Sequence, residues 1–216
     1  MFKLDNKIGL GLASLGRPGY INIGHGKDLG EDKSENTMRD NCHQVLDYAY
    51  ENGIRYFDVA RVYGNAEKFL SSWIRKQSHF NGFVGSKWGY EYLANWSINA
   101  EKHERKDHSA KFLKHQWVET RMNLGKSIDL YHIHSVTPDS DVLENPDVIK
   151  ELEVIKKAMD ANPNRSKKEV INALNKRGDL SSEAKTSEPT EREERMKALG
   201  PRDERMDAIG TGFVAR

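Results

Sequence analysis

The sequence predicts an α/β fold, a parallel (β/α) barrel of which the chain contains only about four strand–helix units before a charged tail. Three observations lead to this prediction. Strand-like apolar runs alternate with helical patterns four times, at about 30–45 residues per unit, which is typical of a parallel sheet with outer helices. Three of these runs end in a polar side chain, as barrel strands that build a site do. The composition then changes near residue 158, after Trp and Tyr have run out.

The first unit begins with an apolar run at residues 6–15, which predicts a strand. Gly9 and Gly11 in this run fit close packing in a barrel strand better than a dinucleotide-binding fingerprint, because no helix opens directly after them. A polar loop at 16–37 would overhang the mouth of a barrel. The first outer helix is expected at 38–52, where the apolar residues have helical spacing.

The second unit carries the most informative stretch, the segment 53–64 with the sequence GIRYFDVARVYG. Residues 54–59 favour a strand, and Asp58 lies at its carboxyl end. Tyr63 follows on the next loop, before a helix expected at 65–77. A carboxylate at a strand tip and a phenol on the following loop are able to meet over one small volume.

The third and fourth units end in two further polar strand tips. Residues 82–87 predict a strand that ends at Lys87, and residues 128–134 predict one that ends at His134. Because the carboxyl ends of barrel strands meet at one face, these side chains are expected near Asp58. The remaining two outer helices are expected at 107–123 and 144–158.

An irregular stretch at 88–107 precedes the third outer helix and carries Tyr90, Tyr92 and Trp96. These aromatic side chains either form a substrate wall or pack the loop, and the sequence favours neither interpretation.

Three histidines in the charged region that follows suggest a metal site at first sight. His103, His108 and His115 do not have the i, i+4 spacing that places two imidazoles on one helical face. They are therefore expected to be solvated, and no metal site is predicted.

The length of the chain limits how much of a barrel it can form. A complete eightfold barrel needs about 250 residues, and only 82 residues follow His134. From Met159 onward about 40% of the residues are charged, and large apolar residues are sparse, so this part is poorly suited to burial. The expected division is therefore a half-barrel at 1–158 and a charged tail at 159–216. Helical patterns in the tail are confined to 166–176 and 190–199.

Composition excludes several classes of protein. A net charge of +1 gives no indication of a nucleic-acid partner. The single cysteine, Cys42, permits no internal disulfide and fits a reducing compartment. No apolar run is long enough to cross a membrane, and no signal pattern opens the chain. These features predict a cytoplasmic protein without a membrane partner, and the open sheet edges of a half-barrel predict self-association.

Four motifs in this order resemble the aldo-keto reductase family. They are IGLGLASLGRPG at 8–19, GIRYFDVARVYG at 53–64, VGSKWGY at 84–90 and IDLYHIHS at 128–135, and the resemblance covers roughly residues 5–158. The family implies a barrel that binds NADPH, with aldehydes, ketones or sugar carbonyls as substrates. The second half of the family's barrel, which holds most of the cofactor site, has no counterpart here. NADP is therefore expected to bind weakly or not at all to this chain alone.

By this resemblance, Tyr63 would be the general acid, Lys87 and Asp58 would form its tuning pair, and His134 would orient the carbonyl. Trp88 would contact the substrate. The chemistry suits these residue types, because a phenol with a pKa of about 10 is a poor proton donor at neutral pH. A nearby ammonium favours the phenolate, and a carboxylate holds the ammonium in place. The alternative is a catalytically silent module derived from the barrel, with a binding or regulatory role.

Overall fold

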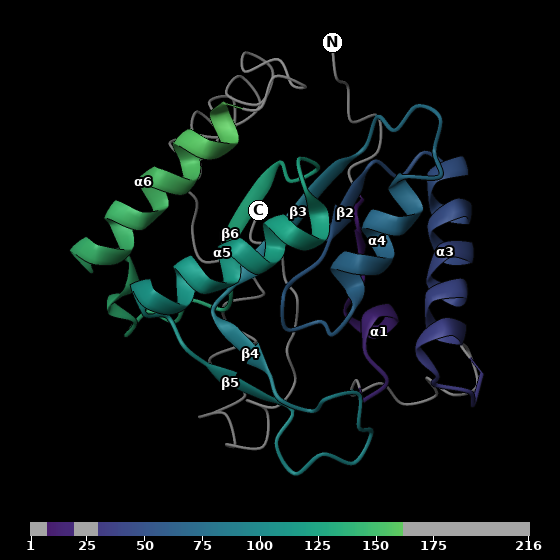
Figure 1. The fold of residues 1–216 in the computed structure, drawn as a ribbon, viewed down its shortest axis with the longest axis horizontal. Helices are drawn as coiled ribbons and strands as arrows, with labels where there is room; N and C mark the ends of the chain where they lie inside the picture. The colour runs from purple at the N-terminus through teal and green to yellow at the C-terminus, as the bar shows by residue number, and fades with distance from the viewer. Residues whose placement is uncertain (1–7, 20–29, 162–216) are drawn as a thin grey trace, which may run out of the picture. The chain divides into compact units, whose positions relative to one another are not determined.

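The computed structural model describes residues 8–19 and 30–161, and these form one compact unit. Its main sheet has four parallel strands in the order β1-β2-β3-β6 (Figure 1). The strands are β1 (Leu10–Gly11), β2 (Tyr56–Asp58), β3 (Phe83–Trp88) and β6 (Leu130–Ile133). The predicted α/β class with a parallel sheet is thus confirmed, as an open sheet of four strands.

Outer helices follow the strands and cover one face of the sheet. In Figure 1, α4 and α5 cross in front of the strands, with α3 on one side and α6 on the other. Neighbouring helices contact each other in the order α3, α4, α5, α6. The helices are α1 (Ala13–Gly16), α3 (Glu35–Glu51), α4 (Ala66–Ile74), α5 (Ala110–Leu124) and α6 (Pro146–Asp160), with a 3-10 turn at Asp141–Leu143.

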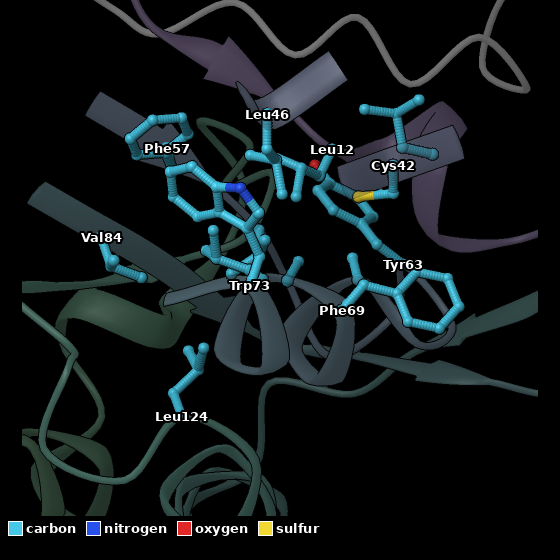
Figure 2. Close-up of a cluster of buried hydrophobic side chains, with 14 of the residues drawn as sticks. Leu12, Cys42, Leu46, Phe57, Tyr63, Phe69, Trp73, Val84 and Leu124 are labelled. Atoms are coloured by element: carbon cyan, nitrogen blue, oxygen red, sulfur yellow. The ribbon is translucent and has the colours of Figure 1, made fainter. Parts of the chain in front are cut away.

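The main hydrophobic core lies between the sheet and α3 and α4. Alternate strand residues supply one side of it, since successive side chains of a strand point to opposite faces. Phe57 of β2 and Val84 of β3 are fully buried there against Leu46 of α3 and Trp73 of α4 (Figure 2). A second, smaller cluster packs α5 and α6 onto β3 through Trp88.

The first strand is shorter than the sequence predicted. The extension of the strand to residue 15 is wrong, because residues 13–16 form α1, where the Gly16 amide donates to the Leu12 carbonyl at 3.0 Å. A short apolar run does not distinguish a buried strand from a buried helical turn. The loop predicted at 16–37 ends before residue 37, because α3 begins at Glu35. Ser34 caps this helix, and its Oγ accepts a hydrogen bond from the Thr37 amide.

The sequence predicted an irregular stretch at 88–107, but part of this stretch forms strands. It contains a two-stranded antiparallel hairpin of β4 (Tyr90–Tyr92) and β5 (Glu104–Lys106). Strands of three residues are too short to show an alternating pattern in sequence. The expected tail helices at 166–176 and 190–199 and the proposed tail as a whole lie outside the described residues.

Candidate active site

The Asp58 carboxylate and the Lys87 ammonium form an ion pair on adjacent strands of the sheet. Asp58 is the last residue of β2, and its Cα is in register with Gly85, two residues before Lys87. Lys87 Nζ donates to Asp58 Oδ2 and also to the carbonyl of Val59 at 3.1 Å. Both side chains are less than one-fifth exposed, so the pair lies in a poorly solvated position at the strand tips.

Tyr63 reaches this pair from the loop between β2 and α4. The Tyr63 amide donates to Ala60 O at 3.0 Å, and the Ala66 amide donates to Tyr63 O at 3.1 Å, so turns fix the backbone on both sides. The following residue, Gly64, has a φ of +61°, and a Cβ there would lie 2.6 Å from Gly16 O. The Tyr63 hydroxyl lies 3.3 Å from Lys87 Nζ, and its side chain is buried.

His134 approaches the same hydroxyl from the end of β6. Its amide donates to the Trp88 carbonyl at 2.9 Å, which fixes the backbone one residue past the strand. His134 Nε2 lies 3.5 Å from the Tyr63 hydroxyl, at the limit of a hydrogen bond, and the two rings meet edge to face. Asp58, Tyr63, Lys87 and His134 are therefore brought together as one cluster, which we call the strand-tip cluster.

Burial governs the protonation of two members of the strand-tip cluster. It lowers the pKa of the His134 imidazole from 6.5 to about 3, and the nearby positive charge of Lys87 acts in the same direction. His134 is therefore neutral at pH 7. Burial also lowers the pKa of the Lys87 ammonium, while the carboxylate of Asp58 opposes this shift.

Two residues that the sequence did not single out extend the cluster on the same face of the sheet. The Tyr56 hydroxyl lies 3.3 Å from Asp58 Oδ1 and 3.3 Å from His132 Nε2. His132 lies on the same face as His134, because side chains two positions apart in a strand point the same way. Gly85 leaves room for this contact, because a Cβ there would lie 2.3 Å from the Tyr56 hydroxyl oxygen.

The β4–β5 hairpin flanks the cluster on the side of His134. The ring of Tyr90 meets the ring of His134 at 5.1 Å between centroids, and His108 Nε2 lies 2.9 Å from the His134 carbonyl. Tyr90, Tyr92 and Trp96 all pack, partly buried, against the main core. The ring nitrogen of Trp96 also donates to the Lys33 carbonyl at 2.8 Å. These aromatic side chains therefore pack this stretch, and a substrate wall that includes Tyr90 stays a prediction.

Arg17 ties the hairpin to the loop that carries Tyr63. Its Nη1 donates to Glu104 Oε2 of β5 at 2.8 Å and to the Val62 carbonyl at 3.2 Å. The guanidinium is largely buried, so it acts as an internal brace. The motif at 8–19 contains Arg17, but its spacing gave no reason to select it.

The structure does not bring Trp88 to the strand-tip cluster. Trp88 is fully buried in the smaller core, packed with Leu113 of α5 and Val148 of α6. It follows Lys87 in β3 and therefore points to the opposite face of the sheet. A direct contact between Trp88 and a substrate bound at Tyr63 is incompatible with this placement.

A second carboxylate cluster occupies the helix-covered face, and the sequence did not indicate it. Glu67 of α4 is fully buried. Its Oε1 accepts hydrogen bonds from Ser86 Oγ at 2.7 Å and from Thr120 Oγ1 at 2.9 Å. Its Oε2 accepts Asn123 Nδ2 at 2.8 Å and faces Arg61 Nη1 at 3.5 Å. We call these five residues the Glu67 network.

Among the described residues, the cations near the strand-tip cluster all have partners within the protein. A dinucleotide's phosphates need free donors or cations, and the three nearby cations are engaged within the protein. Lys87 pairs with Asp58, Arg17 pairs with Glu104, and Lys106 donates to the Ser135 carbonyl at 3.0 Å.

Two further kinds of feature are absent from the described part of the chain. No group of three or more His, Cys, Asp or Glu side chains is arranged to hold a metal ion among residues 8–19 and 30–161. No helix within those same ranges is long and apolar enough to cross a membrane.

The geometry permits a proton transfer at one point. An oxygen atom placed near the Tyr63 hydroxyl would also lie near His134 Nε2, because the two are 3.5 Å apart. The Lys87 ammonium stands behind the phenol, where it stabilises a phenolate that has given up its proton. The strand-tip cluster is thus equipped to protonate an oxygen on which negative charge develops.

Comparison with known proteins agrees with this geometry. The model of the Aldo/keto reductase family matches residues 7–176. Two solved structures of proteins assigned as aldo-keto reductases from Pseudomonas aeruginosa are similar in fold. One has a TM-score of 0.51 and 24% identity, and matches 69% of this chain and 50% of its own. The other has a TM-score of 0.50 and 26% identity, and matches 69% and 49%.

The search of curated proteins returned no match. The chain spans about half the length of the solved structures that it matches. The family match nevertheless covers most of the chain and includes all four residues of the strand-tip cluster. With the parallel sheet and its outer helices, it places this chain in the aldo-keto reductase family.

Proposed function

We propose that this chain reduces an aldehyde, a ketone or a sugar carbonyl, with Tyr63 as the proton donor. One observation carries the proposal: the Tyr63 hydroxyl lies within reach of both Lys87 Nζ, at 3.3 Å, and His134 Nε2, at 3.5 Å. A structural tyrosine needs one partner for its hydroxyl, whereas this one lies between a cation and a neutral imidazole. That arrangement supports a group that gives up a proton and is stabilised afterwards.

Each member of the strand-tip cluster has a distinct part in the proposed reaction. The carbonyl oxygen lies between Tyr63 and His134, and His134 orients it. As negative charge develops on the oxygen, Tyr63 transfers its proton to it, and the resulting phenolate is stabilised by Lys87. The Asp58 carboxylate holds the Lys87 ammonium in position.

Reduction also requires a hydride at the carbonyl carbon, which a nicotinamide nucleotide such as NADPH supplies in this family. The cations beside the strand-tip cluster have partners within the protein, so binding of the nucleotide to this chain is a separate part of the proposal. This same observation favours a second candidate function. In it, the chain binds a carbonyl compound at Tyr63 without turnover, as a silent binding or regulatory module.

A two-step assay distinguishes these candidates. NADPH is first titrated against the chain while nucleotide fluorescence is followed, and turnover of a simple aldehyde is then measured at saturating NADPH. The reductase proposal expects saturable binding and NADPH consumption that depends on the aldehyde. Absence of turnover with both NADPH and NADH would contradict it and favour the silent module.

The variant Tyr63→Phe tests the role of the hydroxyl itself. Loss of general acid catalysis should reduce turnover by about 10²–10⁴-fold, while the buried ring keeps its packing. Tyr48→Phe is the matched control, because Tyr48 is exposed on α3 and 71% accessible. Equal turnover in Tyr63→Phe and Tyr48→Phe would exclude Tyr63 as the proton donor.

A further inference from the structure

The two faces of the main sheet are covered very differently. Phe57 and Val84 are fully buried beneath the helices. Tyr56 and Phe83, their neighbours in β2 and β3, point to the other face and are only partly buried. No described element packs over that second face as a layer. Parallel sheets occur almost only with both faces covered, so this inner face requires a cover.

The edges of the sheet raise a related requirement. In the described part of the chain, β1 and β6 each pair on one side only, and all pairs are parallel. A parallel sheet removes its edges by closing into a barrel, which takes eight strands in the fold of this family. The described sheet therefore presents the two kinds of edge that such a closure brings together.

The inner face already contains half of a barrel layer. In (β/α) barrels, a layer consists of four side chains from alternate strands. Tyr56 of β2 contacts His132 of β6 at 3.3 Å, across β3, where Gly85 contributes no side chain. Two strands of four thus supply two side chains of four, and an identical pair facing them would complete the layer.

Charge on the inner face does not oppose such pairing. The charges of Asp58 and Lys87 cancel within their ion pair. His132 and His134 are neutral at pH 7, because burial lowers the pKa of both imidazoles. Below this polar level, Phe83 and Leu130 supply partly buried apolar groups. Two identical inner faces therefore bring together apolar groups and internally neutralised polar groups, without a net repulsion.

We propose that two copies of this chain pair about a twofold axis, with β6 of each beside β1 of the other, and close an eight-stranded parallel barrel. The strand order becomes β1-β2-β3-β6 twice, and both edges of each copy are paired. Because all strands run parallel, the two strand-tip clusters then lie at the same mouth of the barrel. This inference does not depend on turnover and extends beyond the proposed reaction.

Sedimentation equilibrium of the full chain tests the proposal directly. The wild type should behave as a dimer with twice the chain mass of 24.7 kDa. Leu130→Asp places a charge on each inner face, opposite its own copy, and should raise the dissociation constant of the dimer at least about a hundredfold. Met122→Asp is the matched control, since Met122 is 80% exposed on α5, and should leave the dimer unchanged.

Other outcomes would overturn the proposal. They are a monomeric wild type over the whole concentration range, a dimer that Leu130→Asp leaves intact, and assemblies that grow without a stable dimer. Hydrogen exchange of the wild type provides an independent readout that needs no variant. Dilution below the dissociation constant should speed exchange in β6 while leaving α4 unchanged. Unchanged exchange in β6 across the dissociation would likewise contradict closure through this edge.

Discussion

Ser86 and Lys87 are neighbours in β3, yet they belong to two carboxylate clusters on opposite faces of the sheet. On the helix side, Ser86 donates to Glu67, which is fully buried and accepts hydrogen bonds from three side chains besides facing Arg61. On the inner side, Lys87 pairs with Asp58, and both remain partly exposed. The two clusters use the same chemical groups in different surroundings.

The difference lies in how completely the polar groups are satisfied by the fold. Each oxygen of Glu67 has protein donors, so the Glu67 network is complete in itself and joins α4, α5 and β3. The strand-tip cluster is incomplete, because the buried Nδ1 atom of His134 has no hydrogen-bond partner among the described residues. A complete buried network stabilises a fold, whereas an incomplete one is a candidate for contact with a ligand.

The largest expected effect is on stability and comes from the Glu67 network. Glu67→Gln removes a charge that four side chains are arranged to meet and should cost about 3–5 kcal/mol in the free energy of unfolding. Urea denaturation followed by circular dichroism measures it. Glu119→Gln is the control, because Glu119 also pairs with Arg61 but is 36% exposed, and its cost should be at most about 1 kcal/mol. Similar costs for both variants would contradict the distinction.

The next largest effect is the pH dependence of stability that comes from His134 in the strand-tip cluster. The pKa of His134 is about 3 in the folded protein and 6.5 for an ordinary histidine. Between these pH values the unfolded chain binds more protons at His134 than the folded protein does. The contribution of His134 to the free energy of unfolding is therefore fully present above pH 6.5 and is lost as the pH falls toward 3. His134 should contribute about 2–3 kcal/mol of the loss between about pH 7.5 and pH 4.5.

Urea denaturation at several pH values checks this contribution. His134→Gln should show a correspondingly shallower loss of stability in acid than the wild type. His115→Gln is the control, because His115 is 65% exposed on α5, and it should follow the wild type. An unchanged acid profile in His134→Gln would show that the imidazole is not held neutral by the fold.

A smaller effect is expected from one donor of the Glu67 network. Ser86→Ala removes the hydroxyl that donates to Glu67 Oε1 at 2.7 Å. Hydrogen bonds to charged groups are worth about 1.5–3 kcal/mol, and Thr120 still serves the same oxygen, so the loss should be near the lower value. The exposed Ser97→Ala should change stability by less than about 0.5 kcal/mol. A neutral Ser86→Ala would mean that the network is not tightly coupled.

The strand-tip cluster was predictable from sequence because most of its residues lie where strand-like runs end. Asp58, Lys87 and His134 each lie at the carboxyl end of a strand-like run, and such ends converge at one face of a parallel sheet. Tyr63 was found through its motif. The face of the sheet to which a side chain points was harder to predict than its place at a strand end, as Trp88 shows. One position along a strand reverses the face, so a neighbour of a site residue points away from the site.

The Glu67 network was not predictable from sequence. A glutamate near the start of a helix is ordinarily an exposed residue that interacts with the helix dipole. Its burial depends on donors from β3 and α5 that lie 19, 53 and 56 residues away along the chain. The β4–β5 hairpin was missed for a related reason, since three-residue strands gain their order from pairing rather than from a pattern of their own.

The claim that the inner face binds a carbonyl oxygen and the helix side does not is tested most directly by nuclear magnetic resonance of the histidine ring nitrogens. His134 reports on the inner face, and His43, which bonds the Phe69 carbonyl and Ser72 at 3.1 and 2.9 Å, reports on the helix side. Titration with a small ketone such as cyclohexanone should shift the His134 resonances saturably, leave those of His43 in place, and have less effect in Tyr63→Phe. Equal shifts at both histidines, or none at His134, would contradict the account.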